Sequence, residues 1–137
     1  MTAAAVSTAP ATGKAMKIAG WTLSGLFTAF MLFDVTLKLV GHPEVAKASA
    51  QLNLPPESGF AIGVMEGLIL ALYLLPRTAV LGCLLIAALM GGTAATHLVN
   101  GNPWASHILF GPYLAVFAIG GLWLRDTAFR RLFPIRR

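Results

Sequence analysis

The sequence predicts an all-α fold: an integral membrane four-helix bundle with a short interfacial helix between transmembrane helices 1 and 2. Hydrophobic residues make up 57% of the 137 residues and charged residues only 11%, whereas a soluble domain carries roughly 25% charged residues. Apolar segments of roughly 17 to 23 residues are long enough to cross a bilayer as helices. Backbone groups in hydrocarbon must pair within their own segment, which favours helices over other structures. The four expected helices are residues 18–40, 59–75, 79–99 and 107–124.

Two tails flank the expected transmembrane domain, residues 17–124. Residues 1–16 are rich in alanine, threonine, serine and proline and contain no acid, which predicts a disordered N-terminal tail. A cleaved signal peptide is the alternative, but the apolar run that follows is too long and contains Asp34 and Lys38. Residues 125–137 hold five arginines among apolar residues, which predicts a basic cytoplasmic tail that contacts anionic lipid headgroups.

The basic residues indicate how the chain crosses the membrane. The formal net charge of +5 could suggest a nucleic-acid partner, but the charge lies mostly at the ends of membrane segments, where topology rules place it. Lys14, Lys17, Arg77 and the C-terminal arginines mark one side, and the loop between the third and fourth helices contains no lysine or arginine. We therefore expect a multi-pass protein of the inner (cytoplasmic) membrane with both termini in the cytoplasm, and no nucleic-acid partner.

Glycine and proline define the end of the first helix. Gly41 can adopt a left-handed cap, and Pro43 prevents the helix from continuing. Pro43 can also open a new helix at its first position, so residues 43–54 are expected to form an interfacial helix or lid over the mouth of the bundle. An ordinary ordered loop fits these residues equally well.

The later helices carry packing signals. Gly59, Gly63 and Gly67 are spaced four apart, so one face of the second helix allows close helix contact. A very short turn then makes the second and third helices an antiparallel hairpin. In the fourth helix, Pro112 has no backbone N–H, which predicts a kink or a free carbonyl near Ile108.

Two helix ends resemble one another. Residues 38–43 read KLVGHP and residues 97–103 read HLVNGNP. A duplicated helix pair would produce this echo. Helix-ending chemistry would also place glycine and then proline at both positions, and we favour that explanation.

Polar side chains from different helices are expected at one level of the bundle. Glu66 lies about 10 Å below the outer surface and Asp34 about 9 Å below it, at a rise of about 1.5 Å per residue. Lys38 follows Asp34 by one turn, in the favourable order for an ion pair. His97 closes the third helix and His107 opens the fourth on the outer side. These five residues are the candidates for a polar pocket in the outer half, and the cytoplasmic half is expected to be dry.

Several roles fit this polar group. Asp34 and Lys38 can neutralise one another as a structural pair, and Glu66 can join them or stay protonated. A proton-handling pocket would use Glu66 as proton donor or acceptor, and Lys38 or a histidine to hold an anionic or quinone-like oxygen. The group could also be a ligand pocket without chemistry. We expect no metal site, because no HxxxH or HxxE spacing supports one.

Other chemistry-bearing motifs are absent from the sequence. Cys83 is the only cysteine, so the chain forms neither an internal disulfide nor a CxxC redox pair, and we interpret it as a buried packing residue. The sequence has no glycine-rich phosphate loop, nucleophile elbow, or haem, nucleotide or iron–sulfur motif. The catalytic residues therefore stay unknown, and a quinone is the cofactor class that remains open.

Three stretches carry a resemblance to the DoxX-like family of small four-helix integral membrane proteins. They are FDVTLKLVGHP at the end of the first helix, GVMEGLILALYLLPR around Glu66, and ATHLVNGNPW at the end of the third helix. The similarity covers Ile18 to about Leu124. It implies an association with thiosulfate:quinone oxidoreductase or with membrane oxidoreductase complexes, although the missing cysteine pair argues against a thiol mechanism.

We therefore expect a subunit of a quinone-linked membrane redox system, mainly from this resemblance. The alternative is a non-enzymatic membrane binding or assembly protein whose polar pocket holds a lipid or small molecule. The expected partners are the lipid bilayer and either another membrane subunit or a second copy of the chain. Whether the chain is itself an enzyme stays open at this point.

Overall fold

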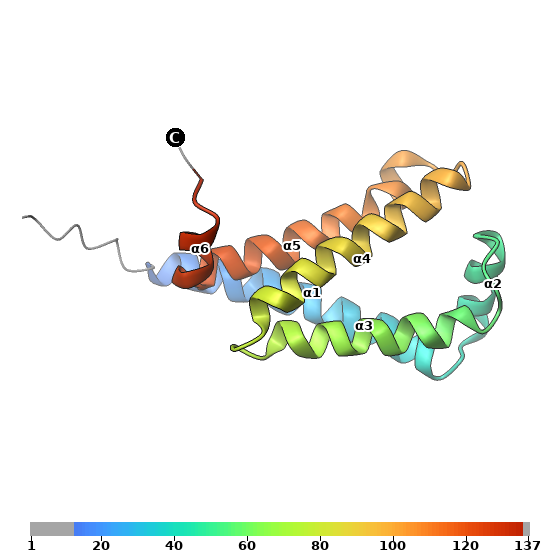
Figure 1. Ribbon diagram of the computed structural model, residues 1–137, viewed down its shortest axis with the longest axis horizontal. Helices are drawn as coiled ribbons and strands as arrows, with labels where there is room; N and C mark the ends of the chain where they lie inside the picture. Colours follow the sequence, from blue (N-terminus) through green and yellow to red (C-terminus); the bar gives the residue numbers. More distant parts are fainter. Residues whose placement is uncertain (1–12, 136–137) are drawn as a thin grey trace, which may run out of the picture.

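The computed structural model describes residues 13–135, and every regular element in that range is a helix (Figure 1). The long helices are α1 (Lys14–Leu39), α3 (Ser58–Leu74), α4 (Ala79–Val99) and α5 (Phe110–Arg125). The shorter elements are α2 (Pro43–Gln51), the π-helical turn η1 (Trp104–Ile108) and α6 (Thr127–Leu132). The prediction of an all-α fold is confirmed.

Three helical runs are long and apolar enough to cross a membrane. They are α1 with 26 residues, α4 with 21 residues, and the run Trp104–Arg125 with 22 residues. α3 is also apolar, but it is shorter, with 17 residues. Many large apolar side chains of these helices point outward, as a lipid-facing surface requires. The chain is thus suited to a lipid bilayer, while a fourth crossing by α3 stays a prediction.

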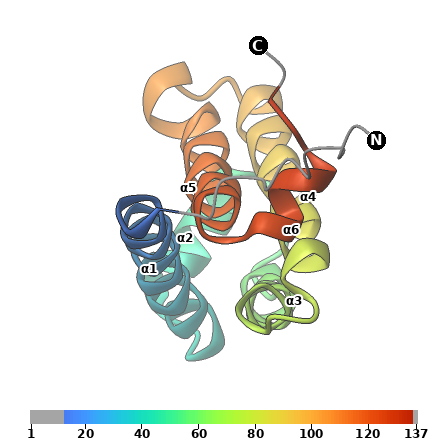
Figure 2. The ribbon, with the colours of Figure 1, turned by 90° about the vertical axis from the view of Figure 1, so that its left-hand side faces the viewer.

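The four long helices pack side by side. α1 contacts α3 and α5, and α4 contacts the same two helices, so the four form a closed ring (Figure 2). Cys83 is buried, as expected for a packing residue. The largest fully buried side chains in the core are those of Tyr73, Phe27, Met31, Ile86 and Leu122.

The glycines expected to serve packing on α3 face α1 and α2. A Cβ atom added to Gly59 would lie 2.5 Å from a Val45 methyl group on α2. A Cβ on Gly63 would lie 2.7 Å from the Cβ atom of Lys38 on α1. Gly67 is less crowded, since its nearest neighbour would be at an ordinary contact distance of 3.5 Å. The first two glycines therefore allow α1 and α2 to approach α3 closely.

The helix starts differ from expectation in two places. α1 begins at Lys14, inside the expected tail of residues 1–16, and residues 1–12 lie outside the described part. Between α1 and α3 the chain forms the helix α2 and not a loop. His42 caps it, because its Nδ1 accepts a hydrogen bond from the Glu44 backbone N–H at 3.3 Å, and Pro43 occupies the first position. The interfacial location of α2 stays a prediction.

The fourth apolar segment begins with an irregular turn. η1 comes first, and α5 begins only at Phe110. The Leu109 N–H donates to the Trp104 carbonyl at 2.9 Å, five residues back, which is the wider π spacing. Pro112 has no N–H to offer the Ile108 carbonyl, so regular α-helical bonding cannot extend back from it. The irregularity predicted near Ile108 is therefore present.

α1 and α4 end with the same cap. Gly41 and Gly101 have φ values of +67° and +68°, the left-handed region that glycine adopts without strain. The residue after each glycine donates its N–H to the carbonyl five residues back, at 3.0 and 3.1 Å. Equal caps support helix-ending chemistry as the source of the sequence echo. When the two helix ends are aligned at these glycines, Lys38 corresponds to Leu98 and not to His97.

Part of the basic tail, residues 125–137, forms α6. The Asp126 side chain caps this helix by accepting the Phe129 N–H at 2.9 Å. The Phe129 side chain is buried in the core, so α6 folds back onto the long helices. Contact of this tail with anionic headgroups stays a prediction.

Candidate functional site

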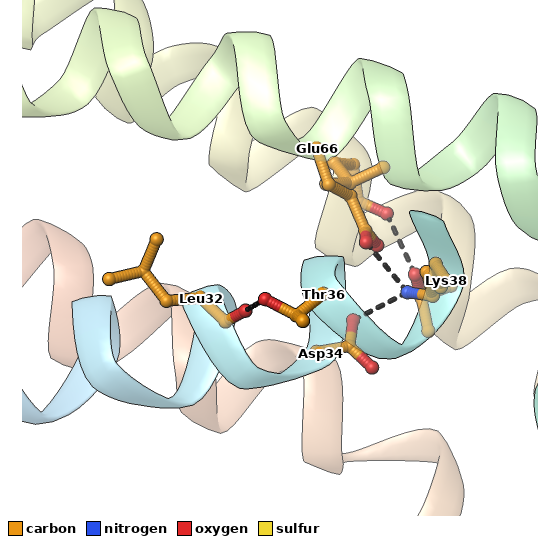
Figure 3. Close-up of polar contacts among 7 residues, drawn as sticks. Leu32, Asp34, Thr36, Lys38 and Glu66 are labelled. Carbon is orange, nitrogen blue, oxygen red and sulfur yellow. Dashed lines mark hydrogen bonds and ion pairs between the residues drawn. The ribbon is translucent and has the colours of Figure 1, made fainter. Parts of the chain in front are cut away.

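Asp34, Lys38 and Glu66 form one ion-paired group, which we call the ion triad. The Lys38 ammonium donates to Asp34 Oδ2 at 2.5 Å and to Glu66 Oε2 at 2.6 Å (Figure 3). Asp34 and Lys38 lie one turn apart on α1, and Glu66 reaches them from α3. The close approach at Gly63 brings the two helices near enough for this contact. The structure therefore places the two acids on either side of one lysine.

The ion triad is buried unevenly. The Glu66 side chain is 6% exposed, that of Lys38 18%, and that of Asp34 30%. The carboxylate from α3 thus lies deepest, and the carboxylate from α1 lies nearest the surface. A buried charge without partners is costly, so the shared lysine is what allows Glu66 to sit at this depth.

His97 and His107 form a second group, which we call the histidine pair. Their ring centroids are 5.5 Å apart, with 68° between the ring planes. His97 Nδ1 lies 2.8 Å from the Asn102 side-chain nitrogen, and His107 Nδ1 lies 2.8 Å from Ser106 Oγ. η1 carries His107 back toward the end of α4, which explains how residues distant in sequence meet.

The five predicted residues therefore form two separate groups, the ion triad and the histidine pair. Within residues 13–135, no hydrogen bond or ion pair joins the ion triad to the histidine pair. The same range contains no group of three or more His, Cys, Asp or Glu side chains that could hold a metal ion. A single pocket that contains all five residues stays a prediction.

Two hollows of the surface lie elsewhere. A groove of about 270 Å³ between α1 and α5 is wholly apolar. A wider hollow of about 690 Å³ runs along the start of α1, beside Lys14, Lys17 and Trp21. Neither is lined by the ion triad or the histidine pair. The residues that line the apolar groove are Leu26, Phe27, Phe30, Phe110, Tyr113, Leu114 and Phe117.

A third polar group occupies the opposite end, near α6, where the sequence predicted a dry interior. The Tyr73 hydroxyl is fully buried and donates to the Ala118 carbonyl at 2.8 Å. Ser24 Oγ lies 2.8 Å from the same hydroxyl, and Arg125 Nε donates to Ser24 Oγ at 3.0 Å. The Arg125 guanidinium also stacks over the Trp21 ring at 4.2 Å. We call Ser24, Tyr73 and Arg125 the tyrosine network, and it shows that the expectation of a dry cytoplasmic half was wrong.

Counting residues inward from the basic residues at the helix ends could have indicated the tyrosine network. Tyr73 precedes Arg77 by four residues, and Ser24 follows Lys17 by seven, so both lie a short way inside the same end. Serine and tyrosine are common in apolar helices, however, and neither carries a charge that draws notice. The count of charged residues alone therefore missed this group.

A bridge of side-chain amides joins the end of α2 to the end of α4. Asn53 Nδ2 donates to Asn100 Oδ1 at 2.7 Å, and Asn100 Nδ2 donates to the Leu52 carbonyl at 3.2 Å. Figure 1 shows α2 standing at the end of the molecule where α4 finishes. This contact holds α2 near the helix ends that carry the histidine pair.

Comparison with known proteins identifies the family. No curated protein and no solved structure matches the chain. A family model, described as the DoxX-like family, matches residues 22–121. The match covers more than two thirds of the sequence and includes most of α1, all of α3 and α4, and most of α5. The chain belongs to the DoxX-like family.

Proposed function

We propose that the protein is a four-helix integral membrane subunit of a quinone-linked redox system, and that the ion triad exchanges protons with a bound ligand. The proposal depends on one observation: the Lys38 ammonium is paired with two carboxylates, one from each of two helices. The association with membrane oxidoreductases that the DoxX-like resemblance implies supports the redox part.

The charge balance of the ion triad suits proton exchange. With both carboxylates ionised, the group carries two negative charges and one positive charge, so uptake of one proton makes it neutral. In an apolar surrounding the two charge states compete closely, because an unbalanced charge is costly there and each ion pair favours ionisation. A group of this kind can accept or release a proton without large movements of the helices.

Lys38 also has capacity to hold a ligand. An ammonium group has three N–H donors, and two of them account for the bonds to Asp34 and Glu66. The third can donate to a water molecule or to a ligand oxygen, such as a quinone carbonyl. Conversion of a quinone to a quinol takes up two electrons and two protons. A partner subunit would supply the electrons, and the ion triad would pass the protons one at a time.

We propose that α3 is the fourth membrane crossing, with both termini on the cytoplasmic side of the inner membrane. At about 1.5 Å per residue its 17 residues extend about 26 Å, close to the roughly 30 Å thickness of the hydrocarbon core. Lys14, Lys17 and Arg77 gather at one end of the helices, and the η1 connection carries no basic lysine or arginine. The ion triad and the histidine pair would then lie in the outer half.

The apolar groove between α1 and α5 favours a second candidate function. Its lining of phenylalanine and leucine side chains suits an acyl or isoprenoid chain. A lipid held there, without any redox chemistry, would make the protein a binding or assembly factor. The experiment that follows separates the two functions.

The substitution Glu66→Gln tests the proposal, because glutamine keeps the size of the side chain and cannot ionise. We expect quinone-linked electron transfer in membranes to fall about a hundredfold, with little change in protein amount or detergent melting temperature. The measurement is reduction of a short-chain quinone by membranes that contain matched amounts of each variant. Extraction of the purified protein shows whether a quinone or another lipid accompanies it.

Glu44→Gln is the matched control. Glu44 pairs with Lys47 at 2.6 Å on the surface of α2, with both side chains 67% exposed, so its loss should leave the rate unchanged. A Glu66→Gln protein with a normal rate and a lowered melting temperature would show that the ion triad is structural, and the redox proposal would fail. Recovery of a bound lipid without any quinone would favour the second function.

A further inference from the structure

We propose that the histidine pair binds a divalent transition-metal ion through the Nε2 atoms of His97 and His107. This site is separate from the ion triad and does not depend on the proposed redox function. Sequence spacing argues against a metal here, because the two histidines lie ten residues apart. The Gly101 cap and η1 remove that objection, since together they reverse the chain and bring the rings into contact.

The separation of the rings matches a shared ion. Zinc–nitrogen bonds are about 2.0–2.1 Å long, so two imidazoles on one tetrahedral ion have ring centroids roughly 5 Å apart. The centroids of His97 and His107 are 5.5 Å apart, and the rings meet edge to face at 68°. This centroid separation is therefore compatible with both Nε2 atoms binding one ion after rotation of the side chains.

The neighbours of the pair can hold each ring in the metal-binding tautomer. A histidine that binds metal through Nε2 carries its proton on Nδ1, and that N–H is normally held by an oxygen acceptor. Ser106 Oγ lies 2.8 Å from His107 Nδ1 and can accept this bond. The Asn102 amide lies 2.8 Å from His97 Nδ1, and a half-turn of the amide presents its oxygen. Both Nε2 lone pairs are then available for an ion.

The surroundings indicate an open and exchangeable site. No third His, Cys, Asp or Glu completes a ligand set among residues 13–135, so water would occupy the remaining positions. His107 is exposed and His97 half-buried, which gives an ion access from water at the helix ends. Imidazole ligands favour Cu²⁺ and Zn²⁺, and Cu²⁺ binds more tightly at a given nitrogen site.

The test is a titration of the tag-free full chain in lipid nanodiscs, once with Cu²⁺ and once with Zn²⁺, in which calorimetry measures the binding. We expect one ion per chain, with Cu²⁺ bound more tightly than Zn²⁺. His97→Ala and His107→Ala should each weaken binding at least about tenfold, and Asn102→Ala should weaken it less. His42→Ala is the matched control, because His42 caps α2 and should leave the affinity unchanged.

Equal binding by the wild type and both alanine variants would overturn the proposal, as would an equal loss in His42→Ala. A second measurement does not depend on the folding of any variant. The electron paramagnetic resonance spectrum of the Cu²⁺-loaded wild type should show coupling to two imidazole nitrogens. A spectrum without nitrogen coupling would exclude the histidine pair as the ligand.

Discussion

The ion triad and the tyrosine network hold buried polar groups at opposite ends of the same helices, and they do so in different ways. In the tyrosine network both buried hydroxyls have partners: Arg125 Nε donates to Ser24, Ser24 pairs with Tyr73, and Tyr73 donates to a backbone carbonyl. In the ion triad two carboxylates share one lysine, so the charges do not balance and one N–H is left over.

This difference indicates which of the two polar groups is suited to proton exchange or ligand binding. The tyrosine network contains no carboxylate, and its buried hydroxyls already bond to one another and to a backbone carbonyl, so it stabilises helix packing. An incomplete charged group retains the capacity to take up a proton or to hold an oxygen atom. Glu66→Gln in the ion triad and Tyr73→Phe in the tyrosine network should therefore separate activity from stability. The effects on stability below run from the largest to the smallest.

Lys38→Met should have the largest effect on stability. It leaves the carboxylates of Asp34 and Glu66 close together and partly buried without their shared cation. Removing one partner from a buried ion pair costs about 3 kcal/mol or more in the free energy of unfolding. Thermal unfolding in detergent measures the loss. The triple variant with Asp34→Asn, Lys38→Met and Glu66→Gln should regain most of it, and failure to do so would mean that the charges are not the cause.

Gly121→Val should have the next largest effect, by forcing α1 away from α5. A Cβ on Gly121 would lie 2.8 Å from the Ser24 backbone nitrogen and would also overlap the Ser24 hydroxyl. Overpacking of this kind costs about 1–3 kcal/mol, and the tyrosine network should be disturbed as well. Gly25→Val is the control on α1, because a Cβ at Gly25 meets nothing within 4 Å. Equal melting temperatures for the two variants would show that the α1–α5 crossing is looser than described.

Tyr73→Phe should lower stability by about 1 kcal/mol and leave quinone-linked activity intact. The change removes a hydroxyl that bonds both Ser24 and the Ala118 carbonyl, so polar groups lose their partner in the core. The ring and its edge contact with Phe27 remain. Chemical unfolding and membrane activity measure the two properties separately. A loss of activity at unchanged stability would reverse the roles assigned to the two ends.

Asn53→Ala should have the smallest effect of the four. It removes the bond to the Asn100 side chain, while Asn100 keeps its bonds to the Leu52 and Thr96 carbonyls. The expected loss is about 0.5–1 kcal/mol, and hydrogen exchange should rise in α2 and not in α3. Faster exchange spread over all helices would show that the bridge stabilises the whole structure.

The residue pattern predicted the apolar helices and a common depth for Asp34 and Glu66, because each depends on a strong local signal. A long apolar run specifies a helix, and a rise of about 1.5 Å per residue set Asp34 and Glu66 at one level. The irregular start of the fourth apolar segment also followed from one residue, Pro112, which lacks an N–H.

Features that depend on helix rotation could not be predicted in the same way. The direction in which His97 and His107 point depends on η1, whose five residues carry no clear π-helical pattern. The tyrosine network depends on the close crossing at Gly121, and the sequence offers many other glycines with equal claim to such a contact. The depth of a residue along a helix can thus be counted from the sequence. The direction in which its side chain points depends on how the helices pack, which the sequence alone does not specify.

The most direct test of the ion triad as a proton-exchanging site is infrared difference spectroscopy. Spectra of the protein in nanodiscs, recorded before and after conversion of added quinone to quinol, report carboxyl groups that change protonation. We predict a carboxyl C=O band in the wild type and in Glu44→Gln that disappears in Glu66→Gln. A wild-type spectrum without that band, or a band that persists in Glu66→Gln, would contradict the account.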